Sequence, residues 1–177
     1  MASAAAAVLR KHPTTRFLVV GDNSLVEMNQ QHYAQVVARL NELGIRNSFI
    51  FTGYRKDVPQ LIAAMDISVL STHREGFGLC VAESMALQKP VVATAVGGLL
   101  DFVQNNVTGY LHQHENSDEL ASAIISLIEN PDQAHRIGVA GYEYVKQNFS
   151  QQKFVHEISQ AYTDLRPSSD PAAKPAQ

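Results

Sequence analysis

The chain has 177 residues, of which 45% are hydrophobic and 18% charged, a composition typical of a globular protein with one sizeable core. A formal net charge of −3 gives no general attraction to nucleic acid or anionic lipid, so we expect no nucleic acid partner. No apolar run approaches the roughly 20 residues of a membrane span. The single cysteine excludes an internal disulfide and suits a reducing cytoplasm.

The first part of the chain predicts alternating helices and strands. Pro13 stops an alanine-rich helix, and Gly44 lies just beyond the end of a second, amphipathic one. Short apolar runs that end at glycines indicate buried strands. The expected elements are a helix over 2–12, a strand over 17–21, a helix over 25–43, a strand over 47–53, a helix over 58–65 and a strand over 66–70.

The second part continues the alternation. We expect Ser117 and Ser150 to cap helices and Pro131 to begin one. The expected elements are a helix from about 79, a strand over 90–95, a short helix over 99–105, a strand over 108–112, and helices over 118–129, from 131 and from 150 to about 165. The tail, 166–177, has three prolines and no apolar pattern, so we expect disorder there.

Strands that alternate with helices predict an α/β fold, a Rossmann-like parallel sheet with helices on both faces. Ligands of such sheets bind beyond the carboxyl ends of the strands. Glycine-rich polar segments stand at four of the expected strand ends. They are 21–23, 53–56, 72–78 and 94–98.

The turn before the helix at Leu79 is the most informative segment. Gly76 and Gly78 allow the backbone to approach a ligand closely, and the first N–H groups of the helix favour an anion such as a phosphate. Glu75 precedes the glycines and Glu83 lies about one turn into the helix. Two carboxylates near a phosphate site suit hydrogen bonds from sugar hydroxyls.

These residues carry a resemblance to a known family. The pattern Glu75-x7-Glu83 with Gly-Phe-Gly inside it, then Ala-Leu-Gln-Lys-Pro-Val-Val-Ala-Thr and Val-Gly-Gly, resembles the retaining GT-B glycosyltransferases of group 1. That family includes bacterial mannosyl-, glucosyl- and galactosyltransferases and sucrose synthase. The likeness runs over about 4–165 and is most specific over 71–109. It implies one half of a GT-B fold, the C-terminal half that binds a nucleotide-diphosphate sugar.

The resemblance also implies roles for residues. Glu75 would contact the donor sugar or its phosphates and be important for transfer, and Glu83 would bind the nucleotide ribose. Backbone N–H groups over 76–79 would meet the diphosphate and sugar. The residues concerned are Gly76, Phe77, Gly78 and Leu79. Tyr54 and Arg55 would lie near the base, and Gly21 would approach the donor.

Structural interpretations stand beside each role. The glycines alternatively form a plain tight turn, and Glu75 alternatively caps it. Glu83 alternatively is a surface acid, Tyr54 and Arg55 belong to a solvated loop, and Gly21 simply ends a strand.

Two further patterns look reactive but are expected to be inert. Cys80 has no base placed beside it by the sequence, so we expect a buried small hydrophobic residue. His112-x-His114-Glu115 is expected to be solvated rather than a metal site, and His73 either lines the site or is an exposed strand-end residue. No Asp-x-Asp motif is present. We therefore expect no metal and no cofactor besides the substrate, as in GT-B enzymes.

Parts of the resembled domain are missing. The family's first strand and the loop whose Arg and Lys clamp the diphosphate have no counterpart, nor has the N-terminal acceptor domain. We expect 1–165 to be a donor-binding domain that lacks its first strand, inactive alone, from a cytoplasmic enzyme that associates peripherally with the inner membrane. The acceptor would be a lipid-linked or saccharide molecule of envelope or exopolysaccharide synthesis. The alternatives are a GT-B epimerase or phosphorylase, or a non-catalytic nucleotide-binding module.

Overall fold

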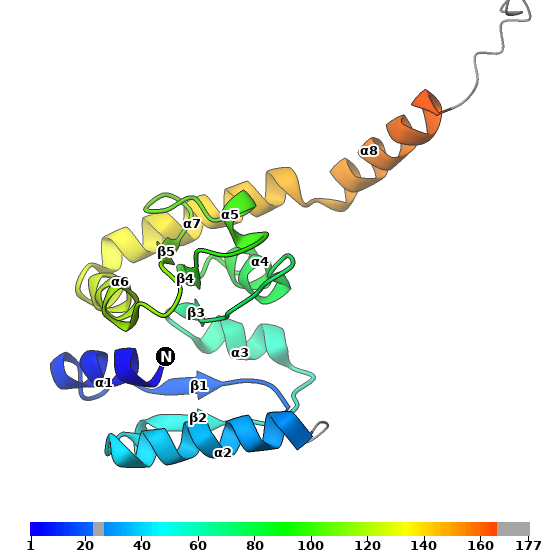
Figure 1. The fold of residues 1–177 in the computed structure, drawn as a ribbon. Helices are drawn as coiled ribbons and strands as arrows, with labels where there is room; N and C mark the ends of the chain where they lie inside the picture. The colour runs from blue at the N-terminus through cyan, green and yellow to red at the C-terminus, as the bar shows by residue number, and fades with distance from the viewer. Residues whose placement is uncertain (23–26, 166–177) are drawn as a thin grey trace, which may run out of the picture.

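The computed structural model describes residues 1–22 and 27–165, and Figure 1 shows the path of the chain. Its elements follow the expected alternation of helices and strands. In chain order they are α1 (Ala2–Lys11), β1 (Phe17–Val19), α2 (Glu27–Glu42), η1 (Arg46–Ser48), β2 (Phe49–Phe51), α3 (Val58–Ala64), β3 (Ser68–Leu70), α4 (Leu79–Ala86), β4 (Val91–Thr94), α5 (Leu99–Phe102), β5 (Tyr110–His112), α6 (Ser117–Glu129), α7 (Pro131–Asn148) and α8 (Gln151–Asp164).

Most boundaries lie where the sequence predicts them. Gly44 ends the second helix in the left-handed conformation, at φ +69°, and the Ser150 side chain accepts a hydrogen bond from Lys153 N–H at the start of α8. Of the expected segments, Asn23, the beginning of the helix over 25–43 and the tail over 166–177 lie outside the described residues.

Three local predictions are wrong. The strand expected over 47–53 begins later, because Ser48 N–H donates to Ile45 O and closes a 3₁₀ turn first. The helix expected over 99–105 has only four residues. The cap of α6 is Asn116 rather than Ser117, since the Asn116 side chain accepts a hydrogen bond from Glu119 N–H at 3.1 Å.

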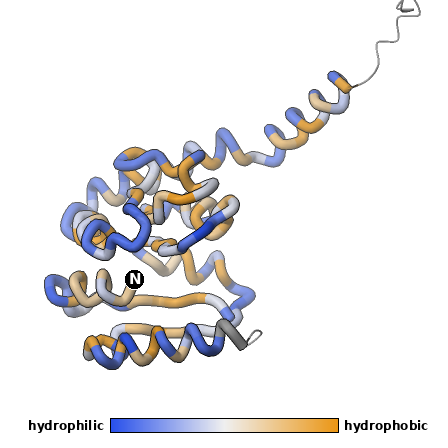
Figure 2. The backbone as a smooth tube through the Cα atoms, in the orientation of Figure 1, coloured by the Kyte–Doolittle hydropathy of each residue, from blue (hydrophilic) through white to orange (hydrophobic). Residues whose placement is uncertain are grey.

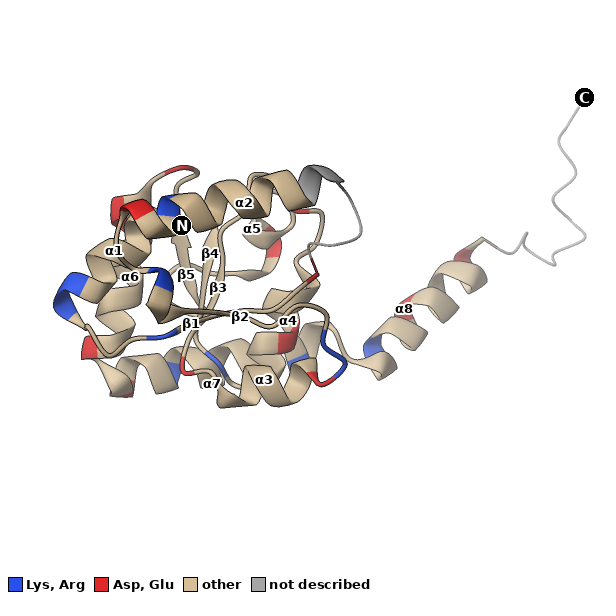
Figure 3. Ribbon diagram, turned by 90° about the horizontal axis from the view of Figure 1, so that it is seen from below, with Lys and Arg blue, Asp and Glu red and all other residues tan. Residues whose placement is uncertain are grey.

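The strands form two parallel sheets. β1 pairs with β2, with Phe17 opposite Phe49. β3, β4 and β5 form the second sheet in that order, with Val69 opposite Val92 and Ala93 opposite Leu111. Helices cover both faces, and Figure 3 shows α2 on one side of the strands and α3 and α7 on the other. The predicted α/β fold with a parallel arrangement of strands is confirmed.

Two apolar clusters make the core. The first joins both sheets, because α1 packs against α6 between Phe17 and Phe49 on one side and Val92 on the other. The second lies under α4 and α5 around Met85, Leu99 and Phe102, all of which are almost fully buried. The apolar colour of β1 and β2 in Figure 2 follows from this packing. The two clusters hold the strands in place, and the loops that follow the strands extend from this core.

Helix α8 differs from all of this. It projects away from the body in Figures 1 and 3, and none of its residues is buried. Its exposed apolar side chains include Phe154, Ile158 and Tyr162. Over the part of the chain that the structure describes, no helix combines the length and the apolar character that a bilayer crossing requires.

Candidate functional site

The loop after β3 and the turn after β4 are held together by their backbones. Gly98 N–H donates to Glu75 O at 3.3 Å. A Cβ added at Gly97 would lie 1.9 Å from Glu75 O, and one added at Gly98 would lie 2.2 Å from Gly76 O. These contacts admit only glycine, so the Gly97-Gly98 pair sets the position of the Glu75 loop.

Glu75 lies at the centre of this loop and is half-buried. Its Oε1 atom accepts a hydrogen bond from Gly78 N–H at 3.1 Å, which is the turn-capping arrangement considered as the structural alternative. Gly78 takes φ +88° and precedes the first residue of α4, as its predicted place in the turn requires. The N–H of Gly78 is therefore already bonded in this structure, whereas Gly76 and Phe77 are exposed.

Helix α4 carries the second acid. Glu83 is exposed on it, one turn beyond the strongly exposed Leu79. The opposite side of the helix buries Val81 and Met85 in the core. Glu83 is thus presented to solvent one turn beyond the start of α4, where the unpaired N–H groups of the first turn favour anions.

Cys80 is exposed, so the prediction of a buried side chain is wrong. The reason is the rotation of α4, which turns Val81 rather than Cys80 into the core. Partial burial of the thiol and the negative charges of Glu75 and Glu83 raise the pKa of Cys80. A thiol that keeps its proton is a poor nucleophile, which agrees with the expectation that Cys80 is inert.

The remaining predicted donor contacts lie in the loops that follow β1 and β2. Gly21, at φ +148°, donates its N–H to Gly53 O at 3.2 Å. Tyr54 is largely exposed, and the Arg55 guanidinium makes two hydrogen bonds to Asp57, at 2.6 and 2.8 Å. Bonding to Arg55 lowers the pKa of Asp57. Among the described residues, no hydrogen bond joins these side chains to the Glu75 loop.

His112 is buried rather than solvated, which corrects the expectation from the sequence. Its ring nitrogens contact Gln113 O at 2.8 Å and Thr94 Oγ1 at 3.2 Å. Thr94 Oγ1 in turn accepts a hydrogen bond from Thr72 N–H at 3.1 Å. Desolvation by burial lowers the pKa of His112, and the network ties together the ends of β3, β4 and β5.

One contact escapes the sequence altogether. The exposed rings of His73 and His114 approach with Nδ1 of the first 2.6 Å from Nε2 of the second. The two residues are 41 positions apart, and only the meeting of the loops after β3 and β5 at one sheet edge brings them together. Glu115 stands beside them.

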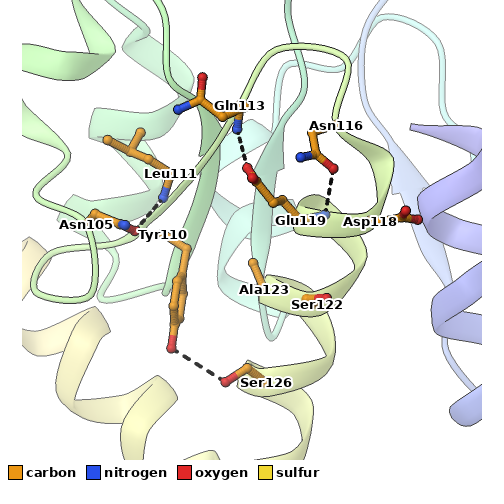
Figure 4. Close-up of a pocket in the computed structure, with 10 residues that line it drawn as sticks. All are labelled: Asn105, Tyr110, Leu111, Gln113, Asn116, Asp118, Glu119, Ser122, Ala123 and Ser126. Atoms are coloured by element: carbon orange, nitrogen blue, oxygen red, sulfur yellow. Dashed lines mark hydrogen bonds between the residues drawn. The ribbon is translucent and has the colours of Figure 1, made fainter.

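A cavity of about 730 Å³ lies beside β5 and α6 (Figure 4). Its walls carry Asn105, Tyr110 and Glu119, and each bonds to another residue of the wall. Asn105 Oδ1 accepts from Leu111 N–H at 3.0 Å, Glu119 Oε2 accepts from Gln113 N–H at 2.7 Å, and the Tyr110 hydroxyl lies 3.5 Å from Ser126 Oγ. None of the residues predicted to bind a donor lines this cavity. It is therefore separate from the site around Glu75.

Comparison with known proteins adds the family. Residues 1–144 match the family described as glycosyl transferases group 1. N-acetyl-alpha-D-glucosaminyl L-malate synthase of Bacillus anthracis is 27% identical over 150 residues, which cover 85% of this chain and 38% of that protein. The chain spans about two fifths of the length of the first curated relatives that it matches.

Solved structures show the same fold. HepE of Anabaena, in complex with UDP, superposes with a TM-score of 0.85 at 29% identity, over 93% of this chain and 44% of that one. The C-terminal domain of a group 1 glycosyl transferase, LpcC of Francisella tularensis, gives a TM-score of 0.78 at 27% identity, over 85% of this chain and 78% of that domain. Each match is partial, and the second is with an isolated domain.

Proposed function

The chain belongs to the group 1 glycosyltransferases, and from this we propose that it is the donor-binding half of a retaining enzyme. The enzyme moves a hexose from a nucleotide-diphosphate sugar to an acceptor. The observation that carries the proposal is the backbone lock between the Glu75 loop and Gly97-Gly98, which holds one acid beside the start of α4 while Glu83 stays exposed on that helix. The structural relative HepE, crystallised with UDP and with UDP-glucose, supports a donor of this class.

In this proposal the donor diphosphate lies against the start of α4. Gly76, Phe77 and Leu79 offer N–H groups to it and to the sugar, and Gly78 joins them when Glu75 releases its hydrogen bond. Glu75, the catalytic residue of the two, then positions the donor sugar, and Glu83 binds the ribose. Negative charge that develops on the leaving diphosphate is stabilised by the end of the helix.

The other sheet contributes the nucleotide side of the proposed site. Gly21 approaches the donor, and the base lies against backbone atoms near Tyr54 and Arg55. We propose that transfer keeps the anomeric configuration by a front-face route and needs no divalent metal or further cofactor, because helix ends and basic side chains supply the positive charge.

The split of the sheet supports a domain that lacks its first strand. Doubly wound sheets of the Rossmann type run in the order 3-2-1-4-5-6. Removal of strand 1 leaves a pair and a triplet, which are the two sheets observed here. The flanking strands β1 and β3 are only partly buried, whereas β4 is fully buried. Residues 1–165 then form the C-terminal domain, and the basic diphosphate clamp lies in the rest of the enzyme.

The unpartnered face of α8 supports a second half of the enzyme. Phe154, Val155 and Ile158 are exposed on a helix with no buried residue. We propose that the N-terminal acceptor domain covers this face. That domain would also carry the acceptor, a lipid-linked or saccharide molecule of envelope or exopolysaccharide synthesis, and any peripheral attachment of a cytoplasmic enzyme to the inner membrane.

The decisive test is ligand-observed NMR with UDP, GDP, ADP and their hexose conjugates. The isolated chain is expected to bind one nucleotide weakly, with a Kd on the order of 1 mM, and to transfer no sugar. Glu83→Ala should abolish binding, and Glu143→Ala, which removes an exposed acid from α7, should not.

The same panel is then applied to a chain extended upstream to include the first strand and its basic loop. Tight binding that Glu83→Ala weakens supports the donor site. If neither chain binds any nucleotide, the proposed function is wrong and a docking module is favoured. Product analysis of the full-length enzyme separates transfer from epimerisation and phosphorolysis.

A further inference from the structure

His73, His114 and Glu115 form a compact group of potential metal ligands. Among the side chains that the structure describes, those of residues 1–22 and 30–165, they are the one group of three His, Cys, Asp or Glu whose ligand atoms all lie within 4.8 Å of one another. All three are exposed, so a metal ion can reach them from solvent. They come from two loops, His73 from the loop after β3 and the other two from the loop after β5.

Both loops are fixed by hydrogen bonds on either side of the ligands. Thr72 Oγ1 donates to Arg74 O at 2.9 Å and closes a turn around His73. Asn116 N–H donates to Gln113 O at 3.1 Å and closes a turn around His114 and Glu115. Glu119 anchors the second loop further, as Figure 4 shows. Its carboxylate accepts a hydrogen bond from Gln113 N–H, and its own N–H donates to Asn116 Oδ1.

The imidazole pair is already close to ligating geometry. His73 Nδ1 and His114 Nε2 are 2.6 Å apart, a hydrogen-bond distance, so a single proton lies between them. Two nitrogens that bind one tetrahedral zinc ion at about 2.0–2.1 Å are about 3.3 Å apart. The rings must therefore separate by about 0.7 Å, which small rotations of exposed side chains allow.

We propose that His73, His114 and Glu115 bind a divalent transition-metal ion, with zinc as the representative ion. Two imidazoles and one carboxylate suit Zn²⁺, Co²⁺ or Ni²⁺, whereas Mg²⁺ and Ca²⁺ prefer all-oxygen sites. The ion replaces the proton shared by the two rings and leaves a fourth position for water. It joins the loop after β3 to the loop after β5 across the end of β4.

This site is separate from the transfer chemistry proposed above and does not depend on it. His73 belongs to the same loop as Glu75 but is not among the proposed donor contacts. The inference departs from the sequence-based expectation of no metal, because the sequence placed His114 and Glu115 with His112 rather than with His73. His112 is buried and bonded to Thr94 and Gln113, so it is not available as the third ligand.

The test is calorimetric titration of the tag-free, metal-stripped chain with ZnCl₂, with MgCl₂ as the negative control. One Zn²⁺ should bind per chain, and at about a hundredfold excess over Kd it should raise Tm by roughly 5–10 °C. His73→Ala and His114→Ala should each weaken zinc binding by at least about 100-fold, and Glu115→Gln by about tenfold. His156→Ala, which removes an exposed histidine of α8, should bind as the wild type does.

Absence of saturable zinc binding by the wild-type chain overturns the proposal, and so does a His73→Ala variant that binds within threefold of wild type. Circular dichroism without metal shows whether the variants fold. If they do not, ¹⁵N NMR of the wild-type imidazoles decides the question. Zinc must shift the ring nitrogens of His73 and His114 but not those of His156, and unchanged signals of the first two refute the site.

Discussion

The two sheets position their loops in different ways. In the β3–β4–β5 sheet, the loop and turn around Glu75 and Gly97 are so close that a single methyl group would not fit between them. In the β1–β2 sheet, a Cβ at Gly21 or Gly53 meets no atom within 4 Å, and hydrogen bonds such as Gly21 N–H to Gly53 O join the loops. The three-stranded sheet therefore fixes the Glu75 loop sterically, whereas the loops of the β1–β2 sheet have open space around their glycines and Tyr54 is largely exposed.

The largest expected effect is that of Gly97→Ala. The new methyl group would lie 1.9 Å from Glu75 O at a residue with φ +51°. Overpacking costs about 1–3 kcal/mol and a left-handed alanine about 1–2 kcal/mol, so the free energy of unfolding should fall by about 3–4 kcal/mol. Urea denaturation measures this fall.

Gly98→Ala separates the cost of the steric clash from the cost of the left-handed backbone conformation. Its φ of −63° suits alanine, so only the clash with Gly76 O remains and a loss of about 1–3 kcal/mol is expected. A Gly97→Ala variant as stable as wild type would show that the two loops are not locked together.

The matching change in the other sheet is Gly53→Ala. Residue 53 has φ +66° and open space around it, so alanine there meets no clash. Only the left-handed backbone conformation is unfavourable, and the free energy of unfolding should fall by about 1–2 kcal/mol. The same urea titrations measure it. A loss equal to that of Gly97→Ala would remove the contrast between the two sheets.

The sequence predicts this contrast only in part. The strand–turn–helix order and the glycine-rich ends follow from hydrophobic periodicity and turn residues, and so does the place of Glu75, Gly78 and Glu83 in one turn and helix. The sequence cannot show that Gly97 and Gly98 face Glu75 and Gly76, because that contact depends on how two loops meet in space. The pairing of His73 with His114 could not be predicted for the same reason, because it also depends on how two loops meet in space.

Errors in side-chain burial have a simpler cause. The apolar residues of α4 fit several helical faces, and small differences in rotation decide between Cys80 and Val81. The expected strand over 108–112 does end at His112, but its side chain, expected to be solvated, lies buried against Thr94 at the edge of the sheet. In both cases tertiary packing, rather than local pattern, selects the buried residue.

A smaller effect on stability is expected from His112, the buried histidine at the end of β5. Its pKa is lowered by burial, so below about pH 6.5 the unfolded chain takes up the proton that the folded chain refuses. Stability should therefore fall as the pH drops from 7 towards 5.5, by at most about 1.4 kcal/mol per pH unit for one proton. His112→Gln should flatten this part of the profile.

The control for this pH dependence comes from the other sheet's helix. His32 is exposed on α2, so His32→Gln should leave the slope of stability against pH unchanged. Urea titrations at pH 5.5, 6.5 and 7.5 on the three proteins make the comparison. A wild-type slope that survives in His112→Gln would show that other groups cause it.

The smallest effect is expected from Arg55→Ala. Arg55 is paired with Asp57 at the protein surface, where ion pairs contribute little, so the urea midpoint should not move measurably. If the β1–β2 sheet meets the nucleotide through backbone atoms, Arg55→Ala should also keep its donor affinity within about threefold of wild type. Glu83→Ala should instead lower the donor affinity by about 10–100-fold, as expected for the loss of one charge-assisted hydrogen bond. Calorimetry of the upstream-extended chain with the nucleotide identified by NMR measures both variants. A loss of donor affinity of more than tenfold in Arg55→Ala would mean that the Arg55 guanidinium leaves Asp57 to bind the donor. The β1–β2 sheet would then contribute side chains as well as backbone to the site.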